Sequence, residues 1–102
     1  MFFQSYDLDI DDSKSPNYYA KESVGIATGM LISSLHLAGL SVLTYTPSRM
    51  QFLTKMLDRP KNEKLFMLLL VGLPSDEAMV PVISKKSLSQ VLTIYDDTKL
   101  EN

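Results

Sequence analysis

Residues 23–48 contain no Asp, Glu, Lys or Arg, although 22% of the chain is charged. A stretch of this kind has to be covered by other protein or by lipid. Ser15 and Pro16 are typical of a helix start and Gly39 of a helix end, which predicts a long helix between them. Because apolar residues surround this helix, we expect it to be buried nearly all round. These residues are Val24, Ile26, Met30, Leu31, Ile32, Leu35 and Leu37.

A membrane span is the alternative explanation for the same stretch. A bilayer crossing needs about 20 consecutive apolar residues, and the helical part offers about 16, with Ser33, Ser34 and His36 among them. We therefore favour a buried core helix and expect no membrane partner. The first six residues lack the basic and apolar regions of a secretory signal, so we expect a cytoplasmic protein.

Small residues recur along the long helix at Gly25, Gly29 and Ser33, one turn apart. Such a stripe lets another backbone approach closely. It indicates either tight packing within the core or a helix crossing against a second subunit, and the pattern favours neither. His36 is interpreted as a core or interface histidine rather than a general base, because a base needs a cleft and an orienting partner.

The remaining pattern alternates strands and short helices. Strands are predicted over residues 1–6, 40–46 and 65–71, and the last, which is continuously apolar, reads as a central strand covered on both faces. Helices are predicted over residues 48–57 and 88–92, and a final strand over 91–95. The fold class is therefore α+β, a sheet flanked by a long buried helix and a short helix.

Composition excludes several function classes. A chain of 102 residues makes one small domain, and a net charge of −2 argues against nucleic-acid binding. With no Cys and a single His, the chain has neither disulfides nor Cys or multi-His metal sites. The spaced aspartates after residue 6 resemble a calcium loop but lack its glycine and its bidentate glutamate, so we predict a solvated loop and no metal.

Charge is unevenly distributed along the chain. Residues 1–22 have a net charge of −3, residues 49–86 of +3 and the residues from 87 onward of −2. The middle third would suit an anionic ligand, although scattered solvated lysines explain the same excess.

One short segment, residues 44–48, carries chemically useful groups. Its sequence is Thr-Tyr-Thr-Pro-Ser, where a predicted strand ends and a helix begins. Hydroxyls and free amide N–H groups gather at such a junction, which suits an oxygen-rich or anionic ligand. Ordinary helix capping by Thr46 or Ser48 is the simpler interpretation.

Several short motifs resemble the second half of the FMN-dependent nitroreductase family, in its iodotyrosine deiodinase-like branch. Residues 57–64, Leu-Asp-Arg-Pro-Lys-Asn-Glu-Lys, resemble the Leu-Gly-Arg-Pro-x-x-Glu-Lys of that branch. Residues 71–74, Val-Gly-Leu-Pro, resemble its Val-Gly-Tyr-Pro. Val80 and Pro81, followed by Lys85 and Lys86, resemble its Val-Pro and basic pair. The resemblance extends over nearly all of residues 1–95.

The resemblance implies an FMN oxidoreductase that works as an intertwined homodimer. A nicotinamide nucleotide would reduce the flavin, which passes electrons to a nitroaromatic, quinone or halogenated substrate. Thr46 would present a donor to the flavin N5, favouring the reduced flavin by stabilising added electron density. Thr44, Tyr45 and Pro47 would line the ring, and Lys85, where the family carries arginine, would face the FMN phosphate.

Family members are about twice this length, so residues 1–102 are expected to be a partial domain, a C-terminal half, with residues 96–102 as a tail. The missing N-terminal half would be one partner and a second copy another. The alternative is a non-catalytic fragment that forms a structural oligomer with weak or no flavin binding.

Overall fold

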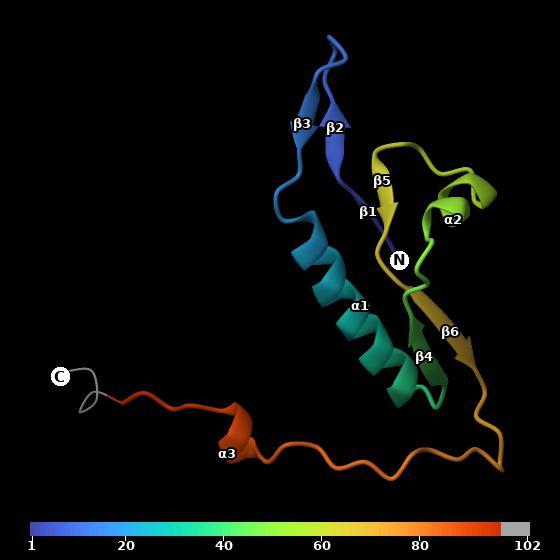
Figure 1. The fold of residues 1–102 in the computed structure, drawn as a ribbon, viewed down its shortest axis with the longest axis vertical. Coiled ribbons are helices and arrows are strands. Elements are labelled where there is room, and N and C mark those ends of the chain that lie inside the picture. The colour runs from blue at the N-terminus through green and yellow to red at the C-terminus, as the bar shows by residue number, and fades with distance from the viewer. Residues whose placement is uncertain (97–102) are drawn as a thin grey trace.

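The structure is a computed structural model that describes residues 1–96. It mixes helices and strands, as the sequence predicts (Figure 1). In chain order the elements are β1 (Phe2–Gln4), β2 (Tyr6–Leu8), β3 (Lys14–Pro16), α1 (Ala20–Leu37), β4 (Ser41–Tyr45), α2 (Gln51–Met56), β5 (Glu63–Leu65), β6 (Leu68–Gly72) and α3 (Leu88–Val91).

The strands form three antiparallel pairs. In the longest pair, β4 and β6, Ser41 lies opposite Gly72 and the last residue of β4, Tyr45, lies opposite Leu68. β1 pairs with β5. The amides of Phe66 and Met67 both donate to the Met1 carbonyl, at 2.9 and 3.4 Å, between β5 and β6. The strand predicted over residues 65–71 is thus two short strands that pair with different partners.

β2 and β3 form a hairpin whose polar loop closes through the Asp9 amide, which donates to the Ser13 carbonyl at 2.9 Å. This pairing corrects the predicted helix start. Ser15 and Pro16 lie in β3, where Pro16 pairs with Tyr6, and α1 begins only at Ala20. The local Ser-Pro signal yields here to cross-strand hydrogen bonding.

The predicted end of the long helix is confirmed at Gly39, whose φ is +83°. Its amide donates to the His36 carbonyl, and the Leu40 amide donates to the Leu35 carbonyl, both at 3.0 Å. These two bonds form a Schellman motif, which needs a left-handed residue at this position.

The predicted burial of the long helix is wrong. Only Val24 and Thr28 of α1 are buried, whereas Met30 is 68% and Leu37 86% exposed. The helix contacts β1 and β4 along one side, and no other element covers its remaining surface within residues 1–96. Residues 1–96 supply too few other elements to enclose an apolar helix of this length.

The expected cover of the last apolar strand is also absent. Leu70 and Val71 of β6 are 51% and 47% exposed, so this strand is not covered on both faces. The short helices predicted near 48–57 and 88–92 are present as α2 and α3. The strand predicted over 91–95 is wrong, because Val91 ends α3 and residues 92–96 have no strand partner in the part described. Apart from Asp96, the predicted tail lies outside the described residues.

The molecule is open rather than compact. Its radius of gyration is 19.7 Å, whereas a compact domain of this length has about 13 Å. Its accessible surface is 9243 Å², against about 5,800 Å² for a compact monomer of its mass. The buried apolar side chains are Val24, Leu53 and Leu65. This part of the chain therefore leaves most of its apolar surface without cover.

Candidate functional site

The predicted site residues 44–47 lie at the carboxyl end of β4, where the chain leaves the sheet for α2. Thr44 and Tyr45 are the last two strand residues and pair with Leu69 and Leu68 of β6. Thr44, Tyr45 and Thr46 are exposed, and Pro47 is half-buried. The segment thus presents its side chains at an open edge instead of being sealed inside packing.

The hydroxyls at this edge are not used for helix capping. α2 starts at Gln51 with Met50 as its N-cap residue, and no side chain bonds to that end of the helix. The hydroxyls of Thr44, Thr46 and Ser48 make no hydrogen bond to any residue of 1–96. The capping interpretation is therefore wrong, and these groups are free to bind a ligand.

Lys85 lies apart from this edge. The chain leaves β6 at Gly72, which pairs with Ser41 at the opposite end of β4 from Thr46. Residues 73–87 then run without regular structure past the lower end of α1 to α3, away from the junction of β4 with α2 (Figure 1). Lys85 is exposed there. A single chain therefore does not bring Lys85 beside residues 44–47.

α3 begins at a capping box. The Ser87 amide donates to the Gln90 side-chain oxygen at 2.9 Å. Ser87 therefore supplies the N-cap from which α3 starts.

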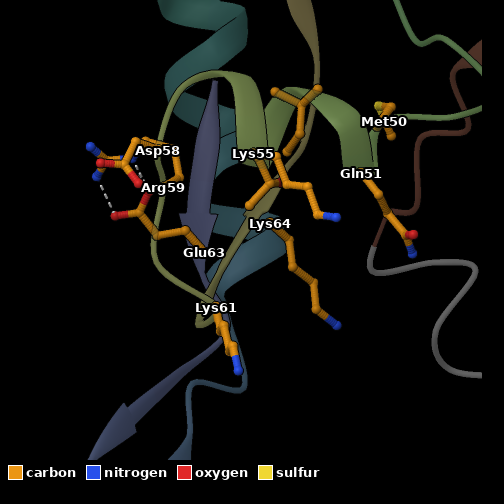
Figure 2. Close-up of a pocket in the computed structure, with 10 residues that line it drawn as sticks. Met50, Gln51, Lys55, Asp58, Arg59, Lys61, Glu63 and Lys64 are labelled. Atoms are coloured by element: carbon orange, nitrogen blue, oxygen red, sulfur yellow. Dashed lines mark hydrogen bonds and ion pairs between the residues drawn. The ribbon is translucent and has the colours of Figure 1, made fainter.

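A second feature, which no sequence motif indicates, is a hollow of about 720 Å³ between α2 and β5 (Figure 2). Its lining includes Lys55, Arg59, Lys61 and Lys64. The excess of basic residues over 49–86 was the sequence signal for this hollow. Four of the seven basic residues of that stretch gather in its lining instead of being scattered.

One cation of this hollow is neutralised within the chain. Arg59 donates to both carboxylate oxygens of Glu63, at 2.7 and 2.6 Å. This pair lowers the pKa of Glu63 and raises that of Arg59, since each charged form is hydrogen-bonded to the other. Within residues 1–96, Lys55, Lys61 and Lys64 lie within 4 Å of no carboxylate.

The other groups singled out from the sequence form no metal-ligand cluster in the described residues. His36 is exposed on α1, so within this chain it is not a core residue. The aspartates of the β2–β3 loop accept hydrogen bonds from the hydroxyls of Ser13 and Ser15. In the described residues no three His, Asp or Glu side chains gather as metal ligands, and none of the helices has both the length and the apolar character that a bilayer crossing needs.

Comparison with known proteins places the chain in a family. No protein-family model matches it. Iodotyrosine deiodinase of Haliscomenobacter hydrossis is 47% identical over 95 residues, which are 93% of this chain and 43% of that protein. Iodotyrosine deiodinase 1 of Homo sapiens is 42% identical over 93 residues, 90% of this chain and 32% of that protein. This chain is an iodotyrosine deiodinase homologue of the nitroreductase family.

The homology with iodotyrosine deiodinase extends to structure. A crystal structure of oxidized iodotyrosine deiodinase bound to FMN and 3-iodo-L-tyrosine matches with a TM-score of 0.56 and 31% identity. The match covers 74% of this chain and 43% of that one. The chain therefore spans less than half the length of the iodotyrosine deiodinases it matches.

The residues at the open edge are of the kind that a flavin ring takes. Residues 44–47 hold hydroxyls without a partner among residues 1–96, which suit the polar rim of a flavin ring. Lys85, which the resemblance assigns to the phosphate, belongs to the segment of residues 73–87 that runs away from this edge (Figure 1). The basic residues closest along the chain are Arg49 and Lys55, which line a hollow together with Ser48.

Proposed function

We propose that this chain forms the flavin-ring edge of an FMN-dependent oxidoreductase of the nitroreductase family and completes its site with a further chain. The observation that carries the proposal is the open edge at Thr44, Tyr45, Thr46 and Pro47 in a homologue of an FMN-binding protein. Bound FMN would supply the electron transfer. The protein's own groups bind and orient the ring.

Thr46 is the residue to which we assign tuning of the flavin. It follows β4 directly, is exposed, and its hydroxyl has no partner among residues 1–96. A donor from Thr46 to the flavin N5 would stabilise the electron density that reduction adds. Thr44, Tyr45 and Pro47 would hold the adjoining ring atoms.

A contact between Lys85 and the phosphate requires a second polypeptide. We propose that Lys85 of one copy reaches the phosphate at the flavin edge of another copy, or that an N-terminal half supplies the missing cations. The chain exposes about 3,400 Å² more surface than a compact monomer of its mass, so two copies together have about 6,800 Å² of excess surface, which exceeds the roughly 2,000–5,000 Å² of an obligate interface. An intertwined homodimer with flavin sites between its subunits would cover that surface.

The substrate we propose is a halogenated phenol. The matched structure holds 3-iodo-L-tyrosine, and its protein is named for deiodination. In such a reaction the carbon–halogen bond breaks, the ring carbon gains a proton, and two electrons from the reduced flavin leave with the halide. A nicotinamide nucleotide would replenish the electrons, and nitroaromatics and quinones are the other acceptors to compare.

The test is flavin binding by the purified chain, with and without added FMN. We expect visible flavin absorbance and a melting temperature that rises with FMN, because a ligand at 100 times its Kd stabilises by about 2.7 kcal/mol. Thr46→Ala should shift the flavin reduction potential downward. Thr93→Ala, at an exposed threonine outside any element, is the matched control. A colourless chain that FMN does not stabilise would contradict the proposal.

The second candidate is a structural oligomer without catalysis. The observation that favours it is that residues 73–87, which include Lys85, run away from the edge at residues 44–47 (Figure 1), since lost charged hydrogen bonds to phosphate cost about 1.5–3 kcal/mol each. An oligomer that binds no FMN and reduces no acceptor with nicotinamide nucleotide would establish this second function.

A further inference from the structure

The chain separates its charge into two patches that the proposed flavin chemistry does not use. Residues 49–64 carry five basic and two acidic side chains, a net charge of +3. Residues 7–12 carry four aspartates and no basic residue. We call the first patch, at α2 and β5, the basic hollow. We call the second patch, at the end of the β2–β3 hairpin, the acidic tip.

The basic hollow combines an apolar floor with unpaired cations. Leu65, which is buried, and half-buried Met50 line it together with lysines from α2 and β5. Figure 2 shows Asp58 and Glu63 gathered with Arg59 on one side, while Lys61 and Lys64 extend away from them. The acidic residues of the hollow therefore lie with Arg59 and leave the charges of Lys61 and Lys64 without an ion pair in the described residues.

The acidic tip presents an apolar side chain between negative charges. Ile10 is fully exposed, at 108% of its reference surface, and lies between Asp9 and Asp11. The Ser13 and Ser15 hydroxyls donate to one oxygen of Asp9, at 3.0 and 2.7 Å, which braces the loop. The Oδ1 oxygen of Asp9 accepts no hydrogen bond from residues 1–96. The tip is thus a braced loop whose aspartates are exposed.

The tip of one chain does not reach its own hollow. The base of the hairpin is tied beside the hollow, because the Asn62 side chain donates to the Tyr6 carbonyl at 3.0 Å. From that base the hairpin projects away from α2 and β5 (Figure 1). The occupant of the hollow therefore has to come from another molecule.

We propose that the acidic tip of a second copy of this chain docks in the basic hollow, with Ile10 against the apolar floor and Asp9 and Asp11 beside Lys61 and Lys64. The two patches are opposite in charge, and an apolar anchor ringed by polar contacts is the usual anatomy of a binding site. In a two-fold pair each copy contributes one tip and one hollow, so the contact forms twice. This inference is independent of flavin binding.

The first test measures association of the full chain by sedimentation velocity. Because exposed charges are screened, we expect the tip contact to weaken about tenfold as salt rises from about 0.05 to 0.5 M. Ile10→Lys should weaken it at least as much, and Lys61→Glu with Lys64→Glu should do the same. Lys86→Glu, at an exposed residue of the segment after β6, is the control and should change little. Asp9→Lys with Asp11→Lys should also weaken the tip contact, and combining that pair with the two hollow substitutions should restore association, because the charges that face each other are then exchanged.

The second test separates this contact from any pairing through α1. The chain contains no cysteine, so engineered ones report single contacts. Copies with Ile10→Cys are mixed with copies carrying Thr54→Cys, in the hollow, or Glu77→Cys, an exposed control. We expect mixed disulfides with Thr54→Cys to form at least tenfold faster. Equal rates, or a charge swap that restores nothing, would overturn the proposal.

Discussion

Left-handed backbone at single residues sets the turns of this chain. Gly39 has a φ of +83° after α1, and Asp12 and Asp58 have φ values of 62° and 49° in the loops that follow β2 and α2. Glycine takes this conformation without cost, and aspartate tolerates it better than most residues. Each of the three turns therefore has, at its left-handed position, a residue type that tolerates this conformation.

Gly39→Ala should destabilise the chain by about 1–2 kcal/mol, because an L side chain is strained in the left-handed region. Gly29→Ala is the matched control, since nothing lies within 4 Å of a Cβ added there and alanine is the better helix former by about 1 kcal/mol. Thermal unfolding followed by circular dichroism compares them. Equal melting temperatures for the two variants would contradict the capping argument.

The Arg59–Glu63 pair predicts a pH dependence. Its hydrogen bonds lower the pKa of Glu63 in the folded chain, so the stabilisation it gives is complete above the unfolded-state pKa and is lost as the pH falls through the lowered one. Arg59→Met should return the Glu63 pKa to its ordinary range, as measured by NMR titration. The Asp9 pKa, which Ser15 and Ser13 lower, should stay where it is. An unmoved Glu63 pKa would show that the pair does not persist in solution.

At the scale of elements, the small-residue stripe of α1 is only partly used within the chain. A Cβ on Gly25 would lie 3.7 Å from Phe66, an ordinary contact, whereas one on Gly29 would meet nothing within 4 Å, and Ser33 is exposed. Internal core packing therefore explains Gly25 and leaves the rest of the stripe open. We propose that the open part crosses a helix of a second subunit.

Gly29→Leu tests that crossing. The isolated chain has room for the leucine, so the substitution should leave its own fold intact and act on association alone. We expect a later elution on size exclusion and at least a tenfold weaker dimer. Gly29→Ala should elute like the parent chain. An unchanged elution volume for Gly29→Leu would place the crossing elsewhere.

At the scale of the whole molecule, the open shape is the dominant fact. The radius of gyration of 19.7 Å and the exposed apolar residues of α1, β6 and residues 73–96 mean that one copy buries little core. Hydrophobic burial is the main force that offsets chain entropy. Stability of the folded state is therefore expected to come largely from association.

The melting temperature should consequently rise with protein concentration, because a partner that binds only the folded chain stabilises it by mass action. Calorimetry over a hundredfold range of concentration measures this, with small-angle scattering to follow the radius of gyration. A melting temperature independent of concentration, together with a compact monomer near 13 Å, would refute the dependence on a partner.

Local and family-level features could be predicted from the residues alone: the helix end at Gly39, the strand predicted over 40–46 and found over 41–45, the short helices α2 and α3, and the nitroreductase-family homology. These depend on backbone preferences and on motifs a few residues long. The neighbours of each segment could not be predicted in this way. Ser15 and Pro16 pair as a strand, the apolar run 65–71 divides between two strand partners, α1 is mostly exposed, and the segment with Lys85 runs away from Thr46. The physical reason is that burial and pairing depend on distant segments and on further chains, which no local pattern encodes.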